Sequence, residues 1–123
     1  MPVYLQFGDI KGDVTEAAHV DWIGLTSAQF GTFRHEQGRP IGHDLTDITV
    51  SKGPDRATQP LMREALAGNP KPATIDFARE DGPVYMSVNM TGAAIASWHV
   101  TGSGPQATEW LTFNFTKVEF VKT

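Results

Sequence analysis

The chain has 123 residues, enough for one domain to bury a single core without metal or disulfide staples, so we expect one domain over residues 1–123. Ten Lys and Arg residues stand against 14 Asp and Glu residues. The resulting net charge of −4 argues against a nucleic-acid-binding protein, which needs a basic surface to release counterions from phosphates. The absence of cysteine excludes zinc–thiolate sites, redox motifs and disulfides.

Membrane insertion is not expected either. Residues 82–108 contain no Asp, Glu, Lys or Arg, but polar residues interrupt this stretch too often for a membrane span. An uncharged run built of strands is instead typical of sheet that is covered on both faces. The first residues enter a strand pattern without the basic and apolar regions of a signal peptide, so we expect any export to use another route.

The first half of the chain predicts three strands. Apolar residues alternate over residues 3–7, and strands are also expected at residues 22–30 and 45–51. Residues 9–18 form a polar connection between the first two strands. Residues 31–44 contain several glycines and a proline without a sustained period, which predicts a long loop.

One helix is predicted next. Pro60 suits the first helical position, with Thr58 or Gln59 as the cap, and Gly68 suits the end of the helix. The helix is short and would be marginal alone, so it should dock on the sheet through its apolar stripe, which consists of Leu61, Met62, Ala65 and Leu66.

The second half returns to strands, at residues 73–79, 84–90 and 94–100, with a break at Thr91 and Gly92, and at 108–120. About seven strands and one helix, with no alternation of strands and helices, predict an all-β fold. We expect a two-sheet β-barrel or sandwich with one short docked α-helix.

The closing strand changes phase. Leu111, Phe113 and Phe115 share one face, whereas Val118 and Phe120 fall on the other. Either a bulge near Thr116 or a strand that buries opposite faces at its two ends would explain this. The second arrangement suits a subunit that packs its core on one side and a neighbour on the other.

Three segments resemble a known family in their order and spacing. They are YLQFGDIKG at residues 4–12, KGPDRATQPLM at residues 52–62 and LTFNFTKVE at residues 111–119. Together they are similar to Hcp, the haemolysin-coregulated protein of bacterial type VI secretion systems. The resemblance spans nearly the whole chain.

The resemblance implies a structural protein without an active site or cofactor. It implies a homo-hexameric ring, and rings that stack into a tube inside a contractile sheath, beneath a spike. The tube would be assembled in the bacterial cytoplasm, expelled into a target cell, and carry effector proteins in its channel. The place of a loop that helps rings to stack is taken here by Gly38, Arg39, Pro40, Ile41 and Gly42.

Candidate interface and channel residues come from the uncharged region and the closing strand. Tyr85, Ser87 and Asn89 alternate with apolar residues and could line the channel. Trp98 and Trp110 could pack in the core or lie at a subunit seam, where tryptophan is enriched among residues important for binding.

Catalytic and metal sites are not expected. The four histidines lack the spacing of metal ligands on a helix, and no serine lies in a Gly-x-Ser-x-Gly elbow. Two alternatives to a secretion tube stay open: a monomeric β-barrel that binds a small apolar ligand, and a related phage-type tail tube protein.

Overall fold

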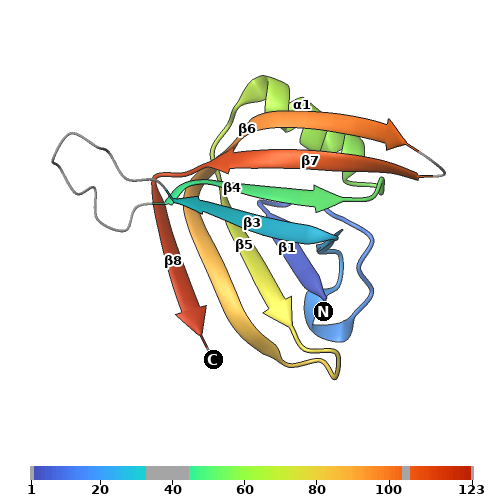
Figure 1. Ribbon diagram of the computed structural model, residues 1–123, viewed down its shortest axis with the longest axis vertical. Helices are drawn as coiled ribbons and strands as arrows, with labels where there is room; N and C mark the ends of the chain where they lie inside the picture. The colour runs from blue at the N-terminus through green and yellow to red at the C-terminus, as the bar shows by residue number, and fades with distance from the viewer. Residues whose placement is uncertain (1, 33–44, 104–105, 123) are drawn as a thin grey trace, which may run out of the picture.

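The computed structural model describes residues 2–32, 45–103 and 106–122. Its strands are joined in the order β2-β1-β5-β6-β7-β4-β3, and β8 pairs with β6. The fold class predicted from the sequence is confirmed, because two antiparallel layers and one helix enclose a common core (Figure 1). The elements are β1 (Val3–Phe7), η1 (Ala17–His19), β2 (Ile23–Leu25), β3 (Ser27–Thr32), β4 (Leu45–Lys52), α1 (Thr58–Ala67), β5 (Lys71–Ala78), β6 (Val84–Ser103), β7 (Gln106–Asn114) and β8 (Lys117–Lys122).

The long strand β6 belongs to both layers. Its first half pairs with β5 and β8, and its second half, from Ala94, pairs with β7. We call β2, β1, β5, the first half of β6 and β8 sheet A, and the second half of β6, β7, β4 and β3 sheet B. Figure 1 shows β6 passing from the lower layer to the upper one.

The break expected at Thr91 and Gly92 is therefore wrong, because the strand continues through it as a bend. Gly92 has φ +63°, and the pairing register with β5 shifts beside it. A side chain there would also meet Thr116, whose Oγ1 would lie 2.8 Å from the added Cβ. The glycine thus lets one strand turn a corner instead of ending.

The closing segment is two strands. The first, β7, ends at Asn114 in sheet B, and β8 begins at Lys117 in sheet A. The expected single strand, with a bulge or with two buried faces, is thus wrong, and the phase change marks a switch of sheet. The expected strand at residues 22–30 likewise divides into β2 and β3, around Thr26.

The core lies between the two sheets. Leu5 and Val88 from sheet A, and Ile48, Leu111 and Phe113 from sheet B, are fully buried. Burying a side chain of this size contributes about 1.5–3 kcal/mol. Helix α1 covers one end of this core and inserts Leu61, so it is docked as predicted.

The helix begins differently from the prediction. It starts at Thr58, which places Pro60 at the third helical position, where the missing N–H has no intrahelical partner to lose. The N-cap is Ala57 rather than Thr58 or Gln59, and its N–H donates to Asp55 Oδ1 at 2.9 Å. Gly68 ends the helix as expected, in the left-handed conformation. Leu66 does not join the buried stripe and is 84% exposed.

Candidate functional site

Sheet B has two open edges. In the described part of the chain, β3 pairs only with β4, and residues 94–103 of β6 pair only with β7. Unpaired N–H and C=O groups at such edges are a template for pairing with another chain. A further strand could therefore pair with sheet B at either edge, β3 or the second half of β6.

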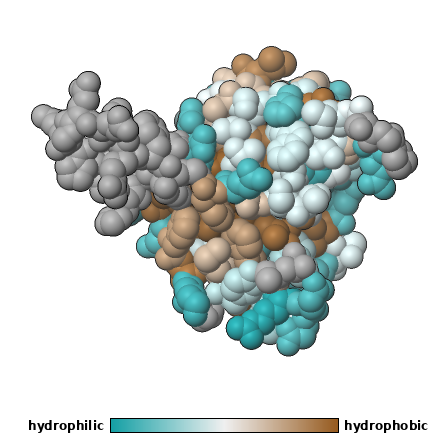
Figure 2. All heavy atoms as spheres, viewed as in Figure 1, coloured by the Kyte–Doolittle hydropathy of each residue, from teal (hydrophilic) through white to brown (hydrophobic). Residues whose placement is uncertain are grey.

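An aromatic strip runs between β3 and β8, and we define it as Phe30, Phe77, Tyr85 and Phe120. The ring of Phe30 lies 5.5 Å from that of Phe120 and 5.9 Å from that of Phe77, and Tyr85 lies 6.4 Å from Phe77. Phe120 is 48% exposed although it faces the core side of sheet A, opposite Val88. Figure 2 shows hydrophobic atoms gathered over this part of the molecule. The strip leaves apolar surface in water beside the open β3 edge.

The face of sheet B that points away from the core carries little charge and is rich in hydroxyl groups. Thr49 and Thr112 form a hydrogen bond at 3.2 Å, as do Ser27 and Ser51 at 2.6 Å. Among the described residues on this face, only Asp47 carries a formal charge. Figure 2 shows this face of sheet B in pale colours, which mark residues of intermediate hydropathy. The hydroxyl groups of this face can form hydrogen bonds with another molecule, and the face has no strong electrostatic field.

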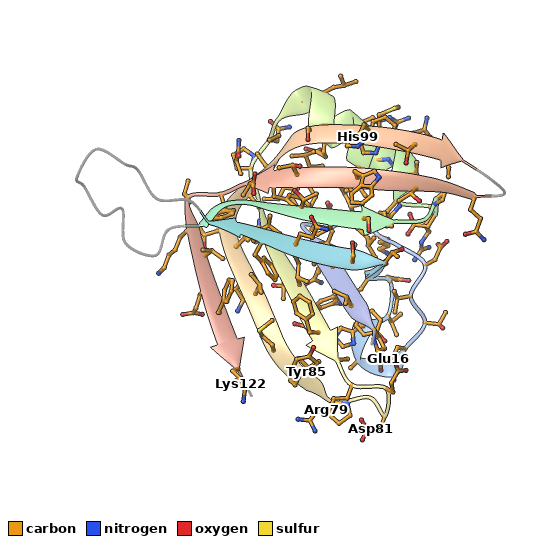
Figure 3. The ribbon with its side chains drawn as sticks, in the orientation of Figure 1. Glu16, Arg79, Asp81, Tyr85, His99 and Lys122 are labelled. Carbon is orange, nitrogen blue, oxygen red and sulfur yellow. The ribbon has the colours of Figure 1, made fainter. Side chains whose placement is uncertain are left out.

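His99 and Trp110 form the aromatic part of the same face. They are cross-strand partners on β6 and β7, and their rings stack at 6.2 Å. The Trp110 indole N–H donates to Thr101 Oγ1 at 3.4 Å. Figure 3 places His99 on the half of β6 far from Tyr85. The pair is thus separate from the aromatic strip.

A buried ion pair lies on the core side of sheet B, beside the start of α1. Lys52 Nζ lies 2.8 Å from Glu109 Oε2 and 2.9 Å from Asp55 Oδ1, and the Lys52 and Glu109 side chains are at most 1% exposed. Glu109 also accepts hydrogen bonds from the Thr58 hydroxyl at 2.6 Å and the Trp98 indole N–H at 3.1 Å. Burial alone would raise the pKa of Glu109, but the bonds from Lys52, Thr58 and Trp98 lower it.

The five predicted interface and channel residues lie on different surfaces. Ser87 and Asn89 lie on the outer face of sheet A and bond within the subunit, to Asp76 at 2.6 Å and Thr74 at 3.0 Å. Tyr85 leaves that face at a register shift and joins the aromatic strip. Trp98 contacts the core, and Trp110 lies on the free face of sheet B. The predicted stacking residues Gly38, Arg39, Pro40, Ile41 and Gly42 lie outside the described residues.

Several residues of these surfaces were missed by the sequence reasoning. The phase change places Phe120 on the opposite face from Phe113, but it does not predict that the ring is exposed. Lys52 and Glu109 carried no local signal, since 57 residues separate them in the sequence.

The positions of the two tryptophans predict different effects of substitution. Trp98→Ala should lower the free energy of unfolding of the subunit by about 3 kcal/mol, because it removes core contacts and one hydrogen bond to buried Glu109. Trp110→Ala should lower it by about 1 kcal/mol or less, because its ring lies on the free face. Urea unfolding followed by circular dichroism measures both. Equal losses would contradict this placement of the two rings.

The described residues hold neither a metal-binding cluster nor a membrane-spanning helix. No group of three or more His, Asp or Glu side chains is arranged to hold a metal ion. No helix in the described ranges has the length and apolar character needed to cross a membrane.

Several solved structures share this fold. Hcp1 from Salmonella typhimurium is 18% identical, with a TM-score of 0.85 over 97% of this chain and 84% of that one. The Hcp1 protein from E. coli EAEC 042 is 15% identical, with a TM-score of 0.90 over 100% and 92%. The sheath-tube complex of the extracellular contractile injection system PVC gives 18% identity and a TM-score of 0.66 over 98% and 88%.

The sequence itself identifies the family. No curated protein matches the chain. The family model described as "Type VI secretion system effector, Hcp" matches residues 4–121. The chain therefore belongs to the Hcp family of type VI secretion proteins.

Proposed function

We propose that this protein is the structural subunit of a type VI secretion tube, which assembles as a hexameric ring and carries effectors in its channel. The observation that supports this most directly is the pair of open edges on sheet B, in a chain of the Hcp family. Stacked rings, a surrounding sheath and a spike are the partners that such a tube requires.

The strand directions support a ring. Strands β3, β4, β7 and the second half of β6 are successively antiparallel, so β3 and β6 run in opposite directions. The β6 edge of one copy can therefore pair antiparallel with the β3 edge of the next. Such a head-to-tail contact between unlike surfaces generates closed rings when its rotation fits.

The apolar side chains beside these edges support the same contact. The aromatic strip lies beside β3, and Val100 is 43% exposed beside the β6 edge. A neighbour that added its strand to β3 would cover the strip. Exposed apolar surface next to an unpaired edge is otherwise an aggregation hazard.

The arrangement of the layers supports one choice of the face that would line the channel. Sheet A and α1 both lie on the core side of sheet B, which adds bulk to that side. A continuous sheet closed into a ring has more room outside than inside. The free face of sheet B, with Thr49, Thr112, Trp110 and His99, would then face the lumen.

A lumen of this chemistry suits varied cargo. Hydroxyl groups and an aromatic pair offer hydrogen bonds and stacking, while the scarcity of charge avoids selection by cargo charge. Each contact would be weak, but a six-fold ring multiplies it through effective concentration. This supports a carrier role rather than an enzymatic one.

We propose that the protein assembles in the bacterial cytoplasm and is then exported as part of the tube.

The ligand-binding alternative receives less support. Large side chains, including Phe7 and Phe113 with rings 5.4 Å apart, occupy the interior between the sheets. A pocket of about 250 Å³ lies at the surface, and its lining consists of Gln6, Gly8, Asp9, Ile10, Lys11, Val20, Asp21 and Trp22. Charged residues share its lining with apolar ones, which does not favour a purely apolar ligand.

Particle mass tests the proposal. Light scattering behind size exclusion, over a range of protein concentrations, should give six times the 13.4 kDa chain, about 80 kDa, or multiples of it. Negative-stain images should show rings with an open centre. A monomer at every concentration would overturn the ring.

A further inference from the structure

The segment formed by residues 9–22, which we call the strap, crosses from β1 to β2 and is fastened to sheet A by His19. This histidine is 2% exposed. Its ring stacks on Tyr4 of β1 at 4.2 Å and meets Trp22 edge-on at 4.6 Å. Both aromatic contacts exclude water from the imidazole.

Each ring nitrogen of His19 faces a carboxylate oxygen. Nε2 lies 2.8 Å from Asp76 Oδ2 on β5, and Nδ1 is paired with Glu16 Oε1 in the strap itself. An ionised carboxylate only accepts hydrogen bonds, so both ring nitrogens must donate. A neutral imidazole has one N–H and can satisfy only one of these partners.

The groups around His19 favour the ionised carboxylates. Hydrogen bonds from the Ala18 N–H and the His19 ring lower the pKa of Glu16. Asp76 Oδ1 accepts a hydrogen bond from the Ser87 hydroxyl at 2.6 Å, which engages its second oxygen. Burial, followed by the charges of Glu16 and Glu80, raises the pKa of Tyr4, so its phenol stays neutral.

We propose that His19 is held as an imidazolium between Glu16 and Asp76, and that this positive charge is a pH-sensitive latch on the strap. The two charged groups that contact it, Glu16 from the strap and Asp76 from β5, are negative, and the rings of Tyr4 and Trp22 contact it without charge. A further carboxylate, Glu80, lies close enough to raise the pKa of Tyr4, so it adds negative charge to these surroundings. This inference does not depend on the proposed function, since the latch lies within one subunit.

The latch has a defined pH response. When pH rises and His19 loses a proton, one nitrogen lone pair faces a carboxylate, and the hydrogen bond becomes a repulsion. When pH falls far enough to protonate Glu16, whose folded pKa is lowered, the other bond weakens. The strap is therefore held most firmly at intermediate pH. It loosens at high pH, where His19 is neutral, and at low pH, where Glu16 is protonated.

Nitrogen-15 NMR of the histidine rings in the wild-type protein tests the protonation state directly. At about pH 6 and about pH 7.5, within the range where ordinary histidines change charge, both His19 nitrogens should have the chemical shift of protonated nitrogen. His99, stacked on Trp110 and facing no carboxylate in the contacts described, serves as the internal comparison. An unprotonated His19 nitrogen at both pH values would overturn the proposal.

Amide hydrogen exchange tests the latch. The N–H groups of Asp21 and Trp22, which donate to Val14 O and His19 O, report opening of the strap. Their protection should fall at least about ten-fold between about pH 7 and about pH 9.5, because hydrogen bonds to charged groups are the stronger ones. His19→Gln should lose the protection at pH 7 and respond little to further increase, whereas His99→Gln should behave as wild type. Protection in wild type that does not change with pH would overturn the latch even if His19→Gln fails to fold.

Discussion

Lys52→Met should destabilise the subunit by about 3 kcal/mol, the lower part of the range for breaking a buried ion pair. The substitution leaves Glu109 buried with only the Thr58 hydroxyl and the Trp98 indole as partners. The same change removes the cation that bonds Asp55 at the start of α1. We therefore expect helix α1 to loosen first, before the sheets unfold. Urea unfolding monitored by circular dichroism measures the loss.

Two variants make this prediction specific. Lys117→Met removes an exposed lysine of β8 and should change the free energy of unfolding by no more than about 0.5 kcal/mol. The double variant Lys52→Met with Glu109→Leu removes both buried charges and should recover much of the loss, because no unpaired carboxylate remains at Glu109. If the double variant is as unstable as the sum of the single ones, the coupling between the two residues is absent.

The same pair predicts acid sensitivity. The pKa of Glu109 is lowered in the folded protein, so its stabilising effect is present at neutral pH. That effect is lost as pH falls below the unfolded value and through the folded one. Lys52→Met removes one cause of the lowered pKa, so the variant should lose less stability than wild type on acidification.

Phe120→Lys should prevent ring assembly while leaving the subunit folded. Phe120 is 48% exposed in the subunit, so the free protein tolerates a lysine there. In the proposed ring a neighbour covers the aromatic strip, and an unpaired ammonium group would be buried at that contact. Light scattering should find a monomer, and circular dichroism should find the wild-type spectrum.

Val121→Lys is the matched control. Val121 is the next residue of β8 and is 43% exposed, but it pairs with Ser87 on the outer face of sheet A. This variant should still form rings. If both variants assemble, the strip is not at the seam; if both are monomers, β8 as a whole is involved instead of the strip.

Much of the fold could be predicted because its signals are local. Alternating apolar residues predicted β1 and β4. The glycine at position 68 predicted the end of α1, and in the structure Gly68 has the left-handed conformation that ends a helix. The ordered motifs indicated the Hcp family, which the match over residues 4–121 shows. A period of two and a glycine stop are determined by neighbouring residues, so one sequence contains them in full.

Only the tertiary structure decided how these elements meet. Trp98 and Trp110 lie on neighbouring strands of sheet B but on opposite faces, and a register shift within sheet A turns Tyr85 away from the face that holds Ser87. The contacts between Lys52 and Glu109, and between His19 and Asp76, each join residues 57 positions apart. Such pairs depend on strand register and on which sheet a strand joins, and a shift of one residue would turn every side chain to the other face. Periodicity can therefore assign a residue to a face, but register and sheet assignment decide what that face contacts.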